Sequence, residues 1–102
     1  MSQWVRLCSR AELPSEREAK EFTVAGKMLC VATVGGRPWA LDNGCPHRGG
    51  PLGEGHVEHG KIVCPWHQWE FDLATGVSSH SHDAKVATFA LQQKGDDVLV
   101  EL

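Results

Sequence analysis

Four residues in the middle of the chain are of types that bind metals, and they form two closely spaced pairs. One residue separates Cys45 from His47, two residues separate Cys64 from His67, and sixteen residues lie between the pairs. Thiolate sulfur and imidazole nitrogen are the protein ligands of zinc and of iron–sulfur centres. The spacing therefore predicts a metal centre with four ligands, namely Cys45, His47, Cys64 and His67.

Two kinds of metal centre compete for this ligand set. Two thiolates and two imidazoles satisfy a tetrahedral zinc ion, which would make the region a structural zinc module. Zinc modules usually place paired ligands about two to four residues apart, however, and a one-residue gap strains the chelate on a single ion. If both thiols bind one iron and both imidazoles bind another, the short gap spans two metals joined by bridging sulfides. The spacing favours such a [2Fe–2S] cluster of mixed ligation, with zinc as the alternative.

The ligand pattern resembles the signature of the Rieske family, in which two histidines replace two cysteines on one iron of a [2Fe–2S] cluster. The stretch WEFDLATG at residues 69–76 is similar to the segment that follows the second ligand loop in Rieske ferredoxins. The resemblance implies an all-β fold, a Rieske-type antiparallel β-sandwich with a small inserted cluster-binding β subdomain. It also implies one Rieske-type [2Fe–2S] cluster as cofactor, with His47 and His67 reaching solvent at the tip of the domain.

By the same resemblance, this chain differs from the respiratory and photosynthetic members of the family. Those members carry an additional cysteine in each ligand loop, joined by a disulfide, whereas this chain has Gly50 and Trp66 there. They also place a serine and a tyrosine hydroxyl near the cluster, where this chain has Trp69 and Phe71. Hydrogen bonds to sulfur raise the reduction potential. We therefore expect a potential in the lower part of the Rieske range of about −150 to +300 mV, which suits electrons from a flavin reductase.

Apolar or alternating runs recur along the chain between turn-forming Ala-Gly and Gly-Gly pairs, a pattern typical of short strands. These strands must position the two ligand loops. The pattern predicts a meander of hairpins at the N-terminal end and a further hairpin at the C-terminal end. The expected strands lie at residues 4–8, 21–25, 27–34, 37–42, 86–93 and 97–102. Residues 9–20 contain helix formers, but Pro14 interrupts them and no apolar stripe is present, so we expect a loop or one short turn there.

The composition changes between residues 43 and 65, which hold six of the eleven glycines and three of the five prolines. Such a backbone makes tight turns that a plain sheet would not tolerate. Short strand-like pieces, HVE, KIVC and QWEFDL, are interspersed in and just after this region. At 102 residues the chain has the size of one domain. We expect a single domain with a base of about 1–42 and 77–102 and a cluster-binding subdomain of about 43–76.

Composition and charge argue against several classes of function. The formal net charge is −3, which gives no basic face for nucleic acid, and no apolar run approaches the length of a membrane span. Arg6, Glu12 and Glu16 fall where a secretory signal would need an apolar stretch. We therefore expect a cytoplasmic protein whose cysteines are thiols or metal ligands, with neither a nucleic acid nor a membrane as partner.

The remaining thiols and imidazoles have simpler interpretations. Cys8 and Cys30 lie in strand-like runs, where cysteine usually behaves as a small buried hydrophobe. His56 and His59 lie between the ligand pairs and are expected to be exposed loop histidines. The stretch HSHD at residues 80–83 offers two histidines and a carboxylate, but three ligands from so short a segment rarely form a facial triad. We expect a solvated loop there.

The resemblance implies a carrier without catalytic residues of its own. We expect a monomeric Rieske ferredoxin that takes one electron from an NAD(P)H-dependent flavoprotein reductase. It would pass the electron to a terminal oxygenase of the aromatic-ring dioxygenase type, docking transiently near His47 and His67. The alternative is a small Rieske subunit of an enzyme complex resembling assimilatory nitrite reductase. Trp66 either packs beneath its loop or forms part of the contact rim, and the sequence leaves both open.

Overall fold

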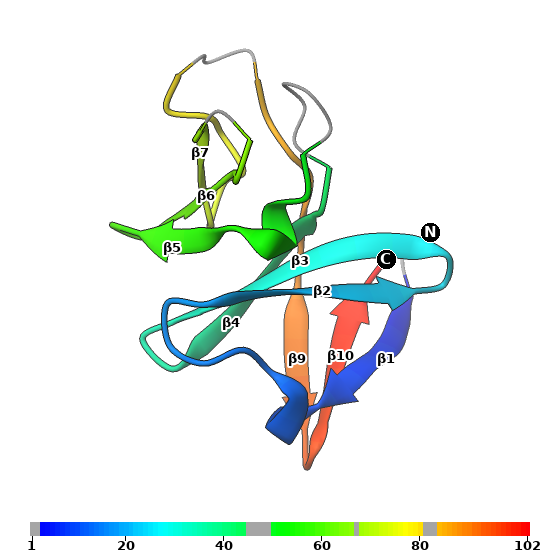
Figure 1. The fold of residues 1–102 in the computed structure, drawn as a ribbon. Helices are drawn as coiled ribbons and strands as arrows, with labels where there is room; N and C mark the ends of the chain where they lie inside the picture. Colours follow the sequence, from blue (N-terminus) through cyan, green and yellow to red (C-terminus); the bar gives the residue numbers. More distant parts are fainter. Residues whose placement is uncertain (1–2, 45–49, 67, 81–83) are drawn as a thin grey trace.

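The structure, a computed structural model, describes residues 3–44, 50–66, 68–80 and 84–102. These residues form strands and two short 3₁₀ turns, η1 (Arg10–Glu12) and η2 (Leu52–Glu54) (Figure 1). The strands are β1 (Trp4–Ser9), β2 (Ala19–Val24), β3 (Lys27–Val34), β4 (Arg37–Asp42), β5 (His56–Glu58), β6 (Lys61–Val63), β7 (Glu70–Asp72), β8 (Thr88–Phe89), β9 (Leu91–Lys94) and β10 (Asp97–Glu101). The expected all-β class is confirmed, and residues 9–20 contain the one short turn that the sequence predicts.

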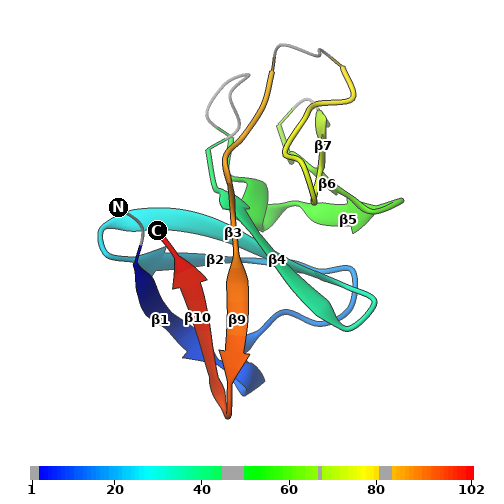
Figure 2. The same cartoon turned by 180° about the vertical axis from the view of Figure 1, so that it is seen from behind.

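The strands form three antiparallel sheets with the orders β1-β10-β9, β2-β3-β4-β8 and β5-β6-β7. In both views the four-stranded sheet lies between the other two (Figures 1 and 2). The hairpins β2-β3 and β3-β4 follow the predicted meander, but β1 does not pair with β2. It pairs with β10, with Trp4 opposite Glu101. The expectation of a continuous meander is therefore wrong at the first strand, because η1 and the extended segment after it carry the chain into a different sheet.

The run predicted as one strand at residues 86–93 is divided between two sheets. β8 pairs with β4, where Ala40 lies opposite Phe89, and β9 pairs with β10, where Leu91 lies opposite Val100. The interruption falls at Ala90, whose carbonyl accepts a hydrogen bond of 3.0 Å from the amide of Glu101. A strand that switches sheets makes a corner between packed layers, a feature that apolar alternation alone does not reveal.

The central strand β3 explains how the layers hold together. Its residues from Leu29 to Thr33 are all buried. Successive side chains of a strand point to opposite faces, so five buried residues in a row need cover on both faces. Cys30 and Ala32 belong to a core cluster that also contains residues of the β5-β6-β7 region: Leu52, Val57, Ile62, Cys64, Phe71 and Leu73. The small sheet is therefore packed on the four-stranded sheet through one shared apolar core.

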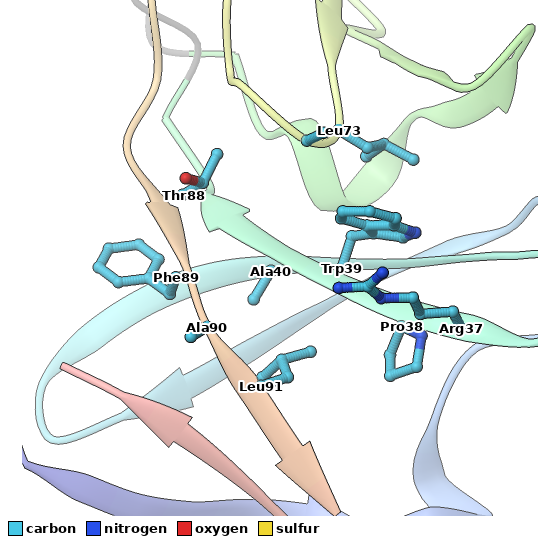
Figure 3. A pocket seen from close by; sticks show the side chains of 10 residues that line it. Arg37, Pro38, Trp39, Ala40, Leu73, Thr88, Phe89, Ala90 and Leu91 are labelled. Carbon is cyan, nitrogen blue, oxygen red and sulfur yellow. The ribbon is translucent and has the colours of Figure 1, made fainter.

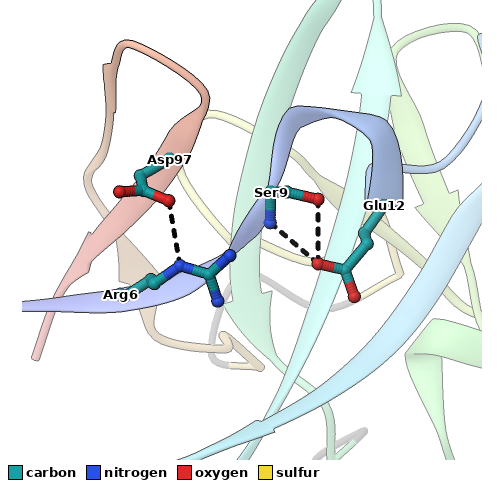
Figure 4. A network of polar contacts seen from close by, with 4 residues as sticks. All are labelled: Arg6, Ser9, Glu12 and Asp97. Carbon is teal, nitrogen blue, oxygen red and sulfur yellow. Dashed lines mark hydrogen bonds and ion pairs between the residues drawn. The ribbon is translucent and has the colours of Figure 1, made fainter.

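Polar contacts secure the turn at the end of β1. The amide and the hydroxyl of Ser9 donate to the same carboxylate oxygen of Glu12, over 2.9 and 3.0 Å (Figure 4). These two bonds lower the pKa of Glu12, the backbone bond most strongly. Across β1 and β10, Arg6 Nε lies 2.9 Å from Asp97 Oδ1, in an exposed pair that contributes little to stability.

A second carboxylate, Glu16, binds the turn between β3 and β4. It accepts hydrogen bonds from the amides of Gly35 (2.6 Å) and Gly36 (2.9 Å), and these bonds lower its pKa. A carboxyl whose pKa is lowered on folding stabilises the fold above its unfolded pKa of about 4.3, and this stabilisation disappears as the pH falls through the folded pKa.

We expect Glu16→Gln to lower the urea midpoint at pH 7, and the difference from wild type to shrink below about pH 4. Urea titrations from pH 3 to 7, with the exposed Glu54→Gln as control, check this. A difference that stays constant over that range would show that the charge of Glu16 plays no part.

Candidate metal centre

Cys64 is the predicted ligand that lies in the described part of the chain. Cys45, His47 and His67 lie outside it. The residues that flank both predicted loops are described, however, so the structure shows where each loop begins and ends.

The first loop leaves and re-enters the fold through a narrow stem. Gly44 and Pro51 pair in an antiparallel bridge, and the amide of Leu52 donates to the carbonyl of Asn43 over 2.8 Å. The two ends of the segment that contains Cys45 and His47 therefore lie side by side. Because its ends are already held together, the segment loses less conformational entropy when it binds a metal.

The side chain of Asn43 anchors this stem. It is almost fully buried, its Oδ1 accepts a bond of 2.7 Å from the amide of Gly53, and its Nδ2 donates to Glu21 on β2 over 2.7 Å. A buried amide with both ends bonded holds its neighbours in one geometry. Asn43 was not among the predicted site residues, although an asparagine directly between a strand and a glycine-rich segment is a usable signal for a turn anchor.

The second loop is a tight connection between β6 and β7. Cys64 directly follows β6, and its amide donates to the carbonyl of Trp69 over 2.7 Å, which closes the turn. Gln68 has a φ of 58°, so the chain passes through the left-handed region just before it enters β7. Within this turn the Cys64 side chain is fully buried, whereas the Trp66 side chain is 49% exposed.

The end of the first loop lies against the thiol of the second. A Cβ added to Gly50 would be 2.8 Å from Cys64 Sγ and 3.0 Å from the ring of Trp66. Any side chain at residue 50 would therefore push on the thiol. This contact places the exit of the first loop directly beside a residue of the second, as a centre with ligands from both loops requires. The buried thiol and the close glycine backbone fit the donor chemistry of a mixed-ligand [2Fe–2S] cluster.

Two aromatic rings lie together at the end of the second loop. Trp69 and Phe71 have ring centroids 6.5 Å apart, and Phe71 is fully buried. Neither side chain offers a hydroxyl donor to sulfur. The expected low reduction potential remains a prediction, and these rings are consistent with it.

The two cysteines assigned to the core behave as expected. Cys8 and Cys30 are 2% and 0% exposed. Burial raises the pKa of the Cys8 thiol, and it raises that of Cys30 to about 12, with the negative charge of Glu21 as a smaller cause.

Because the thiolate is the reactive form, we expect neither thiol to react with iodoacetamide in the folded protein at pH 8. Peptide mass spectrometry after alkylation, with and without urea, checks this, and rapid native labelling of Cys30 would contradict the burial.

The other histidines were expected to be exposed, and those described are. His56 Nε2 lies 3.3 Å from Glu58 Oε1 at the surface, and His59 lies in the turn between β5 and β6 with a φ of 53°. His80 is also exposed, whereas the rest of the HSHD stretch lies outside the described residues. Among the described residues, no group of three potential ligands is placed to hold a metal ion.

A pocket of about 240 Å³ lies away from the two loops, beside β4, β8 and β9 (Figure 3). Arg37 and Thr88 are the polar side chains among its lining residues, and the guanidinium of Arg37 lies 4.1 Å from the centroid of the Trp39 ring. None of the predicted ligands is part of this lining.

In the described ranges, no helix has the length and apolar character needed to cross a membrane.

Comparison with known proteins identifies the family. The model of the Rieske [2Fe-2S] domain matches residues 3–90. The ferredoxin component of the naphthalene 1,2-dioxygenase system from Pseudomonas aeruginosa is 31% identical over 101 residues, covering 98% of this chain and 96% of that protein.

Solved structures show the same likeness. The ferredoxin of carbazole 1,9a-dioxygenase from Nocardioides aromaticivorans IC177 superposes with a TM-score of 0.85 at 26% identity, covering 96% of each chain. A chain described as the small subunit of an NADH-dependent nitrite reductase from Mycobacterium tuberculosis gives a TM-score of 0.88 over 100% of this chain and 96% of its own, at 15% identity, which shows a shared fold. Because the domain model matches most of the chain and the naphthalene dioxygenase ferredoxin aligns over nearly all of it, the chain belongs to the Rieske [2Fe–2S] domain family, and its cofactor is a Rieske-type [2Fe–2S] cluster.

Proposed function

We propose that this protein is a Rieske ferredoxin, a one-electron carrier between an NAD(P)H-dependent flavoprotein reductase and a terminal oxygenase of the aromatic-ring dioxygenase type. One observation carries the proposal. The relative that matches 98% of this chain, over 96% of its own length, is the ferredoxin component of a dioxygenase system. On this proposal the protein makes and breaks no substrate bond and is not itself an enzyme.

The proposed ligands are Cys45 and Cys64 for one iron and His47 and His67 for the other. Their spacing supports this assignment, and so do the burial of Cys64 and the close approach of Gly50 to its sulfur. The cluster supplies reversible uptake of a single electron, at a potential above that of all-cysteine ferredoxins because neutral imidazoles replace two thiolates.

The chain closes both ligand loops at their ends. The stem at Asn43 and the turn between Cys64 and Trp69 are each closed by backbone hydrogen bonds. The apolar core beneath Cys64, with Ile62 and Phe71, keeps water from the inner side of the thiol. A site that changes little in geometry between its two charge states favours rapid electron exchange, which is the property that a carrier requires.

We propose that partners dock on the surface around the second loop, with Trp66 as a contact residue. Trp66 lies in the second loop and is about half exposed. Tryptophan is a residue type that often dominates the binding energy of an interface. The net charge of −3 is small, so the apolar contact is expected to matter more than long-range attraction.

Trp66→Ala tests this surface. We expect the oxygenase concentration needed for half-maximal electron transfer to rise about tenfold, because truncating such an anchor typically costs on the order of 1–2 kcal/mol. Stopped-flow oxidation of the reduced protein by the oxygenase component of a naphthalene dioxygenase system measures it. Trp4→Ala is the matched control, since Trp4 is 44% exposed on β1 of another sheet. Equal behaviour of the two variants would place docking elsewhere.

The proposal includes a monomeric protein in the cytoplasm, where thiols such as those of Cys8 and Cys30 stay reduced. It also retains one domain, with a base of about residues 1–42 and 77–102 and a cluster-binding subdomain of about 43–76. The small sheet β5-β6-β7 lies wholly within the second range, which supports this division.

A stable subunit of a nitrite reductase complex is the second candidate, and a protein so described shares the fold, with a TM-score of 0.88 at 15% identity. Gel filtration of native extract separates the two possibilities. A carrier elutes near its own mass of 11.2 kDa, whereas a subunit elutes with a large partner.

An EPR-monitored redox titration at neutral pH tests the proposed function. We expect a reduced-state signal with the low average g value of a mixed-ligand cluster, and a potential near the lower end of about −150 to +300 mV. Reduction by NADH through a flavoprotein ferredoxin reductase should produce the same signal. A colourless protein that contains zinc and gives no signal would overturn electron transfer.

A further inference from the structure

An aromatic pair joins the end of the second ligand loop to a segment that follows the small sheet. The rings of Trp69 and His80 are stacked, with centroids 5.3 Å apart and planes inclined by 12°. Trp69 ends the second ligand loop, and His80 lies eleven residues later in a segment that the sequence predicts to be a solvated loop. His80 is exposed to solvent, as expected, but its ring has a defined partner.

Backbone contacts hold the segment that presents His80. The amide of Ser79 donates to the carbonyl of Glu70 over 2.9 Å, and Ser78 forms a bridge with Phe71, so the segment runs along β7. The amide of His80 donates to the buried hydroxyl of Ser78 over 3.0 Å. These contacts fix the backbone from which the imidazole extends.

The other side of the pair leads to the predicted ligand Cys64. The carbonyl of Trp69 accepts the hydrogen bond of 2.7 Å from the Cys64 amide that closes the second loop. Restraining the Trp69 ring therefore also restrains the residue whose carbonyl holds Cys64. Just before it, Gln68 has a φ of 58°, a conformation that costs free energy and needs support from its surroundings.

We propose that His80 is a positioning residue of the cluster site. Its ring fixes Trp69 and, through the Trp69 carbonyl, holds the turn from Cys64 to Trp69 closed. This inference rests on the proposed ligand role of Cys64. It assigns to an exposed histidine a function that depends on its aromatic face and not on its charge.

The test compares three variants of the holoprotein. His80→Ala removes the ring, His80→Phe keeps an aromatic face, and His56→Ala removes another exposed histidine, which lies on β5. The first readout is the rate at which visible absorbance is lost in excess iron chelator. The second is the hydrogen–deuterium exchange rate of the Cys64 amide, which reports loop opening directly.

We expect His80→Ala to accelerate both rates by about fivefold, the factor that corresponds to the typical strength of an aromatic pair. His80→Phe and His56→Ala should remain within about twofold of wild type. His80→Ala rates equal to those of His56→Ala would overturn the proposal. A failure of His80→Phe to restore the slow rates would do the same, because the aromatic face would then not be the cause.

The two readouts separate this inference from the proposed function. Wild-type protein without a cluster signal would refute the proposed function, while amide exchange at Cys64 would still test the aromatic pair. If thermal unfolding shows that His80→Ala is globally destabilised, the decisive value is the Cys64 exchange rate relative to that of core amides on β3. A uniform increase overturns the local role, and an increase confined to residues 64–69 supports it.

Discussion

Cys64→Ser is expected to yield a folded protein that contains no iron–sulfur cluster. A serine hydroxyl is harder than a thiolate and does not ionise near neutral pH, so it is a poor ligand for an iron–sulfur centre. The Cys64 side chain is fully buried at the start of the second loop, and serine occupies nearly the same volume. Iron and sulfide analysis, visible absorbance and EPR should all fall to background, while far-ultraviolet circular dichroism should retain the β signal.

Cys8→Ser is the matched control, because Cys8 is also buried but lies on β1 in a different sheet. It should keep a full complement of iron. His67→Cys adds a second comparison: it should retain a cluster if the protein folds, with a potential lowered toward the value of about −400 mV of all-cysteine ferredoxins. A Cys64→Ser protein with a normal Rieske spectrum, or an unchanged potential in His67→Cys, would refute the ligand assignment.

Gly55→Ala is expected to destabilise the protein strongly. A Cβ at this residue would lie 1.9 Å from the carbonyl oxygen of Val63, a backbone atom that no rotamer change can move away. Relief requires η2, which Gly55 follows, to separate from β6. Val63 immediately precedes Cys64, so the same shift would pull the exit of the first loop away from the second. We expect a loss of about 2–4 kcal/mol in the free energy of unfolding.

Gly44→Ala provides the control for this second variant. Its added Cβ would have one neighbour, Asp42 Oδ1 at 3.7 Å, an ordinary contact distance. Its stability should change by less than about 0.5 kcal/mol. Urea unfolding followed by tryptophan fluorescence measures both variants. Similar midpoints for Gly55→Ala and Gly44→Ala would show that η2 is not packed against β6 as the structure describes.

The parts of the fold that were predicted correctly depend on local signals. β3 and β4 have the predicted bounds, residues 27–34 and 37–42, because the Ala-Gly and Gly-Gly turns on either side punctuate an apolar run. The small strands β5 and β6 were found in the same way. Local backbone preference and turn chemistry decide such elements, and both can be read from a few neighbouring residues.

The errors concern segments that are distant in sequence. The pairing of β1 with β10 joins the two ends of the chain, and the corner at Ala90 divides one apolar run between two sheets. Alternation shows that a segment is a strand with one buried face, but it does not show which strand lies beside it. Partner choice depends on how all the layers pack together.

The same division holds for the metal centre. The sequence alone predicts its chemistry. A Rieske-type cluster follows from the family match and from the spacing of Cys45, His47, Cys64 and His67. Only the tertiary structure brought Gly50 against the sulfur of Cys64 and His80 onto the ring of Trp69. Ligand type and spacing are covalent properties of short segments, whereas these contacts exist only once the β5-β6-β7 sheet has packed on the core.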